Sequence, residues 1–380
     1  MKRKIVYISG TRADYGLMRS VLYHIHTHKS LSLDIIVTGM HLMDEFGMTI
    51  DEIKKDGFNY HIVDVRYNDD TKESMALFIG EFIQRLTPLL RTINPDIILV
   101  LGDRGEMLAG AIVGAYLSIP VAHIHGGEVT STVDDLVRNA ITKLSQIHFA
   151  ATEESAARII RMGEDPSRVF VVGAPGLDQQ LLESLIGIED LERKYNLDFS
   201  NPVLLVVQHP VSLEVNQASE QMRETLEAIV TLQYPTVIIY PNADAGGRAM
   251  INVIKEYEHL SFIRTYKNIP RKDFLSLMRY SSALIGNSSS GIIEGPSFGI
   301  PVINIGSRQQ GRERSDNIID VDYNRESIIS AVNYVLNNET YKNKLKSITN
   351  PYKHGNSGKK IVDMLSKIMI NNQLLQKKVN

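Results

Sequence analysis

Carboxylates and imidazoles follow two short apolar runs in the first half of the chain. Asp103 comes just after one run, His125 and Glu128 come after the next, and Asp134 lies a few residues beyond. Crowding of carboxylates raises the proton affinity of at least one of them, and such a group suits general acid/base catalysis. The alternative is structural: Asp134 caps a helix and Asp103 only orients the neighbouring arginine.

A hydroxyl-rich segment in the second half, Gly286 to Gly291, follows the apolar run Ala283 to Ile285. The first turn of a helix carries unpaired N–H groups and a partial positive charge, so a phosphate can be held there beside Ser288 and Ser289. Glu294, one helical turn later, can accept hydrogen bonds from ribose hydroxyls. This spacing predicts a nucleoside diphosphate site, and the alternative is an ordinary capped helix with a surface glutamate.

Three further loops carry groups that suit an anionic substrate. Arg12 follows the first apolar run and can form paired bonds to a phosphate, although an arginine in a loop is often only solvated. His209 precedes a proline, which holds it extended and can aim its imidazole at a leaving group. A lone histidine is more often structural, so a functional role for His209 depends on its neighbours. One of these neighbours is Asn242, which follows the next apolar run.

The elements that position these loops are short runs rich in Val and Ile, which alternate with longer amphipathic segments. Buried parallel strands are typical of such runs, which span residues 5–8, 33–37, 61–65, 97–101, 121–124 and 169–172, then 203–207, 236–240, 260–264, 283–285 and 302–304. Helical periodicity covers residues 72–91, 106–117 and 134–144. The alternation predicts an α/β protein with two doubly wound, Rossmann-like sheets, whose ligand crevice lies at the carboxyl ends of the strands.

The length of 380 residues exceeds one typical domain core and favours two domains. We place the N-terminal domain at 1–185, the C-terminal domain at 200–358, and a terminal helix with a basic tail at 359–380. A cleft between the two domains is the expected site.

The composition of the chain excludes several classes of binding partner and cofactor. The net charge is −3 with no long basic run, so a nucleic-acid partner is not expected. The chain has no cysteine, which excludes disulfides and thiolate chemistry and favours a cytoplasmic location. Neither a signal peptide nor a stretch of membrane-spanning length is recognised, and without a G-x-G-x-x-G fingerprint no dinucleotide cofactor is expected. We also expect no metal.

Taken together, these residues resemble the UDP-N-acetylglucosamine 2-epimerase family, specifically its hydrolysing branch, which serves sialic and legionaminic acid pathways. The resemblance covers nearly the whole chain. It rests on strings in one order: Gly10 to Tyr15, Val37 to His41, Leu101 to Arg104, Gly126 to Glu128, Val133 to Asp135 with Arg138, Ile141 to Leu144, His209 to Val211, Gly286 to Glu294 and Ile305 to Gln309.

The resemblance implies a GT-B glycosyltransferase-like fold with a UDP-sugar in the interdomain cleft, and a homodimer or homotetramer. It implies that UDP leaves C1 by anti-elimination to a glycal, which is then hydrated to UDP and a free sugar of the N-acetylmannosamine type. The substrate would be UDP-N-acetylglucosamine or UDP-2,4-diacetamido-2,4,6-trideoxy-glucose. The alternatives are a non-hydrolysing UDP-N-acetylglucosamine 2-epimerase and a GT-B glycosyltransferase.

By position, the resemblance also assigns roles. Asp103 and Asp134 match acids that act on the sugar, and His209 matches a cleft histidine. The UDP contacts would be Arg12, Arg104, Asn242, Ser288, Ser289, Glu294 and Arg308.

Two positions depart from the family pattern. His125 stands where many relatives carry an acid, which leaves the C2 base open between His125, Glu128 and Asp103; a neutral imidazole can also accept a proton near pH 7. Leu17 stands where some relatives have a lysine.

Overall fold

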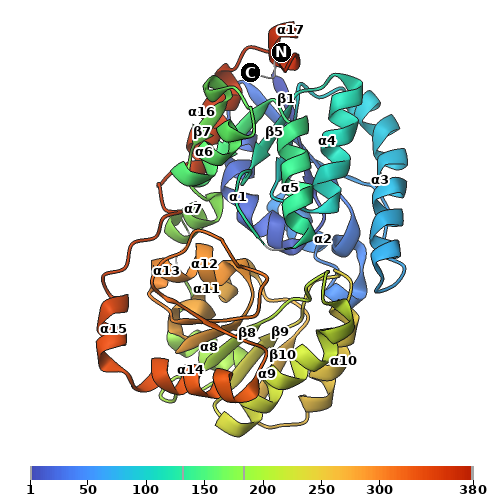
Figure 1. The fold of residues 1–380 in the computed structure, drawn as a ribbon. Helices are drawn as coiled ribbons and strands as arrows, with labels where there is room; N and C mark the ends of the chain where they lie inside the picture. Colours follow the sequence, from blue (N-terminus) through green and yellow to red (C-terminus); the bar gives the residue numbers. More distant parts are fainter. Residues whose placement is uncertain (1, 131, 183–184, 378–380) are drawn as a thin grey trace.

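Two parallel β-sheets, each covered by helices, make up two domains stacked one above the other in the computed structural model (Figure 1). The structure describes residues 2–130, 132–182 and 185–377. The first sheet has the strand order β3-β2-β1-β4-β5-β6-β7 and the second the order β10-β9-β8-β11-β12-β13. Every described strand pair is parallel, which confirms the predicted doubly wound class.

The strands are short and mostly buried, as expected for sheets covered on both faces. In the first sheet they are β1 (Arg3–Ser9), β2 (Leu31–Val37), β3 (Tyr60–Ile62), β4 (Ile97–Leu101), β5 (Val121–Ile124), β6 (Ile147–Ala150) and β7 (Val169–Val171). In the second they are β8 (Leu204–Val207), β9 (Thr236–Ile239), β10 (Ile263–Tyr266), β11 (Ala283–Gly286), β12 (Val302–Ile305) and β13 (Ile318–Val321).

The helices connect these strands and cover their faces. The N-terminal part contains α1 (Arg12–Thr27), α2 (Ile50–Asp56), α3 (Lys72–Ile93), α4 (Gly105–Leu117), α5 (Val133–Leu144), α6 (Glu153–Arg161) and α7 (Pro175–Leu182). The rest are α8 (Ile188–Tyr195), α9 (Ala218–Leu232), α10 (Gly247–Tyr257), α11 (Arg271–Tyr280), α12 (Ser289–Ile293), α13 (Gly295–Phe298), α14 (Arg325–Asn337), α15 (Glu339–Leu345), α16 (Ser357–Lys367) and α17 (Asn372–Leu375).

Two strands, β6 and β13, were not predicted, and two others are shifted: β3 ends at Ile62, three residues before the predicted end, and β10 begins later than predicted. β6 contains His148, which is fully buried beside Glu164, so a polar residue interrupts the apolar run. β13 lies at a sheet edge, where only half-buried side chains are needed, and includes the exposed Asp320. Strand β10 begins three residues later than predicted, because Leu260 belongs to the turn after α10.

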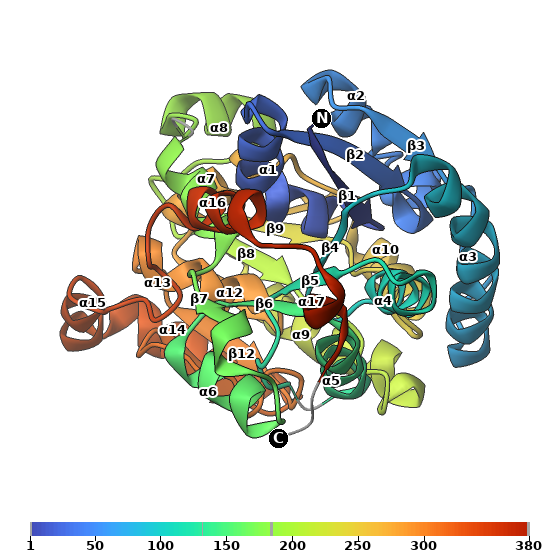
Figure 2. The same cartoon turned by 90° about the horizontal axis from the view of Figure 1, so that it is seen from above.

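The predicted single terminal helix from Lys359 to Gln376 is wrong. The structure has α16, a break, and a short α17 capped by Asn371. Helix α16 returns to the N-terminal domain, where Ile361 and Leu365 join the core under β1 and β2 (Figure 2). The chain therefore crosses twice between the domains. The domain boundaries placed at residues 185, 200 and 358 stay predictions.

The loops at the carboxyl ends of the two sheets face each other across the interdomain boundary. The loops after β4 and β5 come from above, and those after β8, β9 and β12 come from below (Figure 1). This is the edge at which open α/β sheets bind ligands. Among the described residues no helix is long and apolar enough to cross a membrane.

Candidate active site between the two domains

A cavity of about 290 Å³ opens between the two domains. The N-terminal domain contributes residues from the loops after β3 and β4 and from α3, α4 and α5, and the C-terminal domain contributes the loops after β8, β9 and β12. The lining comprises Tyr67, Lys72, Met75, Ala76, Ile79, Asp103, Arg104, Gly105, Val133, Asp134, Val137, Ser212, Leu213, Asp244 and Arg308. Four predicted site residues, Asp103, Arg104, Asp134 and Arg308, therefore share one concave surface.

Asp103 is held by a buried arginine. The guanidinium of Arg138, only 2% exposed, forms an ion pair with Asp103 and a second one of 2.9 Å with Asp135. His123 anchors the same loop, because its Nε2 lies 2.7 Å from the Gly102 carbonyl. Burial alone would raise the pKa of Asp103, but Arg138 and more distant arginines hold that pKa below its usual value. Asp103 is thus a fixed, ionised carboxylate.

Asp134 has the opposite electrostatic character. It begins α5 after the N-cap Thr132, and its Oδ2 lies 3.5 Å from the guanidinium of Arg308 in the other domain. Burial, followed by the negative charge of Asp103, raises the pKa of Asp134 to about 6. A carboxylate with this pKa is half protonated near pH 6 and can both accept and return a proton close to neutral pH.

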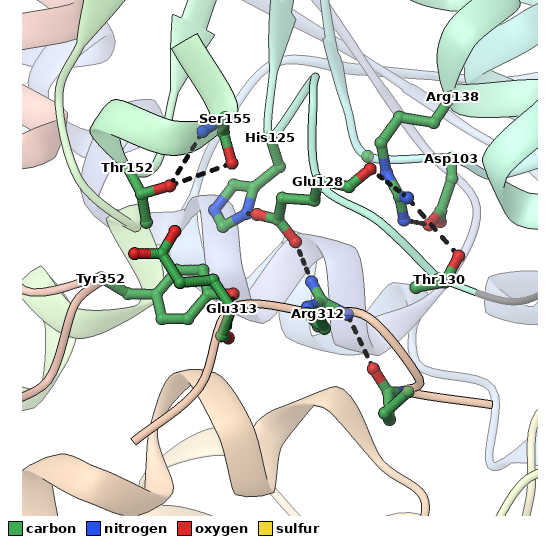
Figure 3. Close-up of polar contacts among 12 residues, drawn as sticks. Asp103, His125, Glu128, Thr130, Arg138, Thr152, Ser155, Arg312, Glu313 and Tyr352 are labelled. Atoms are coloured by element: carbon green, nitrogen blue, oxygen red, sulfur yellow. Dashed lines mark hydrogen bonds and ion pairs between the residues drawn. The ribbon is translucent and has the colours of Figure 1, made fainter. Parts of the chain in front are cut away.

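His125 and Glu128 form a buried pair that is not part of the cavity lining, and their side chains point toward each other (Figure 3). The Nδ1 of His125 contacts one carboxylate oxygen of Glu128, and Arg312 of the C-terminal domain contacts the other. Burial opposes ionisation, but Arg312 and His125 hold the pKa of Glu128 far below its usual value. His125 has the left-handed φ of 62°, a conformation that costs energy for a residue with a side chain and often marks functional loops.

His209 presents a defined tautomer. Its Nδ1 accepts a 3.2 Å hydrogen bond from the Asn242 amide, and its own amide donates to the Asn287 side chain. Burial, with Arg308 and Arg104 nearby, lowers the pKa of His209 to about 3. The imidazole is therefore neutral with its proton on Nε2, which makes it a hydrogen-bond donor.

The predicted nucleotide residues fall into two groups. In the first, Glu294 is 1% exposed and pairs with Arg271, which also donates to the Gly176 carbonyl at 3.3 Å. Arg12, at the start of α1, lies 3.3 Å from Glu52, and burial together with the nearby charge of Arg271 lowers its pKa to about 10. Residues of both domains thus surround the carboxylate predicted to bind ribose.

In the second group, Arg308 links the hydroxyl-rich loop to the cavity, since it donates to the Asn287 carbonyl at 3.3 Å as well as facing Asp134. Ser288 caps α12 and Ser289 begins it. The helix is shorter than expected: it ends at Ile293 because Pro296 has no N–H to continue it. A five-residue helix has a small dipole, so positive charge here comes mainly from arginine side chains.

Arg104 completes the polar side of the cavity. Its guanidinium lies 3.3 Å from Glu106, 3.7 Å from Asp244 and 3.4 Å from the Tyr67 hydroxyl. Asn242 donates to Asp244 at 2.6 Å, so its amide side chain orients the loop after β9.

Five residues around the site had no role assigned from the sequence: Tyr67, Asp244, Arg138, Arg271 and Arg312. Asp244 lies in the same loop as Asn242, and the rule for carboxyl-end loops would have found it. Arg271 and Arg312 are recognisable only once the fold brings them to Glu294 and Glu128.

The comparisons with known proteins agree with this geometry. The UDP-N-acetylglucosamine 2-epimerase family matches residues 23–366. The chain belongs to this family. A protein of Legionella pneumophila described as UDP-N,N'-diacetylbacillosamine 2-epimerase (hydrolyzing) is 42% identical over 99% of both chains. A protein of Campylobacter jejuni described as GDP/UDP-N,N'-diacetylbacillosamine 2-epimerase (hydrolyzing) is 35% identical over 85% of both chains.

Solved structures of this family share the fold. The UDP-GlcNAc 2-epimerase of Neisseria meningitidis, solved with UDP-GlcNAc bound, superposes with a TM-score of 0.79 at 21% identity, covering 96% of this chain and 100% of that one. This likeness confirms the predicted GT-B-like fold with two Rossmann-like domains and a cleft between them.

Proposed function

We propose that this chain is a hydrolysing UDP-sugar 2-epimerase, which converts a UDP-2-acetamido sugar and water into UDP and the free 2-epimeric sugar. The main support is the pairing of two unlike carboxylates in one interdomain cavity, Asp134 with a pKa of about 6 and the ionised Asp103. Two carboxyl groups with separated proton affinities are typical of acid/base chemistry.

The reaction needs one proton removed and one returned. A base takes the proton from C2 while the C1–O bond breaks, its electron pair leaves with the β-phosphate of UDP, and a C1=C2 double bond forms. Water then adds its hydroxyl to C1, and a proton enters C2 from the opposite face. The products are UDP and a sugar inverted at C2.

Asp134 fits the proton exchange, because its pKa lets it act as a base above pH 6. Asp103 fits an electrostatic role: its fixed charge beside C1 stabilises the positive character that develops there as UDP leaves, and the same charge raises the pKa of Asp134. His125, Glu128 and His209 stay predicted catalytic residues, of which His209 suits hydrogen-bond donation to the leaving phosphate.

The departing diphosphate gains negative charge, and arginines of both domains supply positive groups that would meet it. Arg308 and Arg104 line the cavity beside the two acids. Arg271 pairs with Glu294, where the uridine ribose would sit, and Arg12 interacts electrostatically with Arg271. Preorganised charges of this kind stabilise an elimination without reorganising during the step.

The sugar ring beyond C1 would contact apolar side chains of the cavity. The cavity is also lined by the apolar side chains of Met75, Ala76, Ile79, Val133, Val137 and Leu213. A C6 methyl and a C4 acetamido methyl can be buried against such side chains, whereas a hydroxyl would lose its water without finding a partner. We therefore favour a UDP-2,4-diacetamido-2,4,6-trideoxy sugar over UDP-N-acetylglucosamine, by roughly 10- to 100-fold in kcat/KM.

The names of the Legionella and Campylobacter relatives agree with this choice. We propose further that the protein acts in the cytoplasm, in sialic or legionaminic acid synthesis, as a homodimer or homotetramer.

The decisive experiment incubates the protein with each UDP-sugar alone in deuterated water. Release of UDP together with free sugar carrying deuterium at C2, observed by NMR, is the expected result. A product still attached to UDP would indicate a non-hydrolysing epimerase, and dependence on an added acceptor would indicate a glycosyltransferase. Asp134→Asn should abolish release, whereas Asp363→Asn on the surface of α16 is the matched control.

A further inference from the structure

Arg312 lies in the loop after β12 of the C-terminal domain, yet its ion-pair partner, Glu128, is in the N-terminal domain. Its guanidinium forms an ion pair with Glu128, and its other end donates to Gln309 at 3.0 Å. Both Arg312 and Glu128 are less than a tenth exposed. A buried charge that loses its partner is strongly destabilising, so separation of these two residues carries a large cost.

The loop that carries Arg312 fits closely against the N-terminal domain. Gly311 has a φ of 78°, and a Cβ at this position would lie 3.2 Å from Val129 Cγ1. A side chain here would be strained and would press on Val129. Glycine thus lets the loop reach Glu128.

Glu128 connects Arg312 to the catalytic carboxylate. The carbonyl of Glu128 accepts a 3.0 Å hydrogen bond from Arg138, and the same guanidinium holds Asp103 (Figure 3). The other carboxylate oxygen of Glu128 is bound by His125. A continuous chain of contacts therefore runs from Arg312 through Glu128 and Arg138 to Asp103.

We propose that Arg312 is a positioning residue that couples the closed arrangement of the two domains to the orientation of Asp103. Opening of the cleft withdraws Arg312 from Glu128, loosens the loop that binds Arg138, and so disorganises Asp103. Closure restores the contacts. The kinetic part of this inference rests on the proposed function, whereas the structural part does not.

The structural part is tested in the absence of substrate. The chain has no cysteine, so Tyr116→Cys on α4 and Tyr334→Cys on α14, both exposed, can carry a pair of fluorescent dyes, one on each domain. Arg312→Gln should lower the energy-transfer efficiency of the ligand-free protein, because the domains separate. Unchanged efficiency would overturn the proposal. Arg314→Gln is the matched control, since Arg314 pairs with Asp320 of its own domain at 2.7 Å.

The kinetic part uses a double-mutant cycle. Glu128→Gln and Arg312→Gln should each lower kcat roughly 100-fold through misplacement of Asp103, and the double variant should be no slower than the worse single one. Arg312→Lys should recover part of the loss. The double variant also keeps the test valid if one single variant fails to fold, because it leaves no unpaired buried charge.

Three outcomes would contradict this role. Additive losses in the cycle would mean that Glu128 and Arg312 act independently, as a separate base would. A rise in KM alone for Arg312→Gln would make Arg312 a direct substrate contact. A parent protein without turnover would refute the proposed function, and the energy-transfer result would still decide whether Arg312 holds the domains together.

Discussion

Replacing Asp134 with asparagine should inactivate the protein and stabilise its fold. The fold raises the pKa of Asp134 from 3.8 to about 6, and one pKa unit corresponds to about 1.4 kcal/mol. The ionised side chain therefore costs about 3 kcal/mol of folding free energy at neutral pH. Asparagine has nearly the same shape and no charge, so it removes that cost together with the basic group.

The effect has a defined pH window. A carboxyl group whose pKa is higher in the folded state is favoured when protonated, so its penalty is absent well below pH 3.8 and complete above about pH 6. The stability gained by Asp134→Asn should therefore be full at pH 7.5 and small at pH 4.

Differential scanning calorimetry at these two pH values measures the gain as a rise of several degrees in the melting temperature at pH 7.5. Asp135→Asn on the same helix is the matched control: it removes a 2.9 Å ion pair to the buried Arg138 and should lower the melting temperature. A variant Asp134→Asn that melts at or below the wild-type temperature at pH 7.5 would refute the reasoning, as would a gain of equal size at pH 4.

Three other changes have predictable results. Glu294→Gln should raise KM for the UDP-sugar with a smaller effect on kcat, because the carboxylate is predicted to bind ribose; a selective loss of kcat in steady-state assays would contradict this. His209→Asn should lower kcat by roughly 100-fold. The shape of the pH profile of kcat between pH 5 and 9 should not change, since the pKa of His209 is about 3. Loss of the acid or basic limb of that profile in the variant would show that His209 titrates in this range. Glu164→Gln should lower the melting temperature at pH 7, since Lys143, Lys377 and His148 all pair with this carboxylate. Folding lowers the pKa of Glu164 from 4.5 to about 2. The difference in melting temperature between wild type and variant should therefore shrink as the pH drops below 4.5 towards 2.

The sheet architecture could be predicted because buried parallel strands leave a direct signal in the sequence. Ile97–Leu101 and Val121–Ile124 are continuous apolar runs, and the structure has strands at those positions. The loops that follow them were also located correctly, because parallel strands bring their carboxyl ends to one edge. Asp103 and Asp134 lie together in the cavity for this reason.

What could not be predicted depends on contacts between distant parts of the chain. Helix α16 packs against α1 of the N-terminal domain, and the separate α17 begins after its own cap at Asn371. The separation of the proton affinities of the two acids has different causes on each side: Arg138 lowers the pKa of Asp103, whereas burial and the charge of Asp103 raise the pKa of Asp134. Sequence spacing shows that these acids are near each other, but not which arginine faces which.

In the proposed mechanism, the contact between Asp134 and Arg308 connects nucleotide binding to proton transfer. Arg308 lies 3.5 Å from Asp134 and helps to lower its pKa. A bound diphosphate would attract Arg308 and add negative charge nearby, and both effects raise the pKa of Asp134. The acid limb of the kcat/KM profile reports the free enzyme and should have an apparent pKa of about 6. The acid limb of the kcat profile reports the substrate complex and should have a higher apparent pKa. Arg308→Gln should bring the two limbs closer together. A kcat limb at lower pH than that of kcat/KM would mean that the nucleotide does not share Arg308 with Asp134.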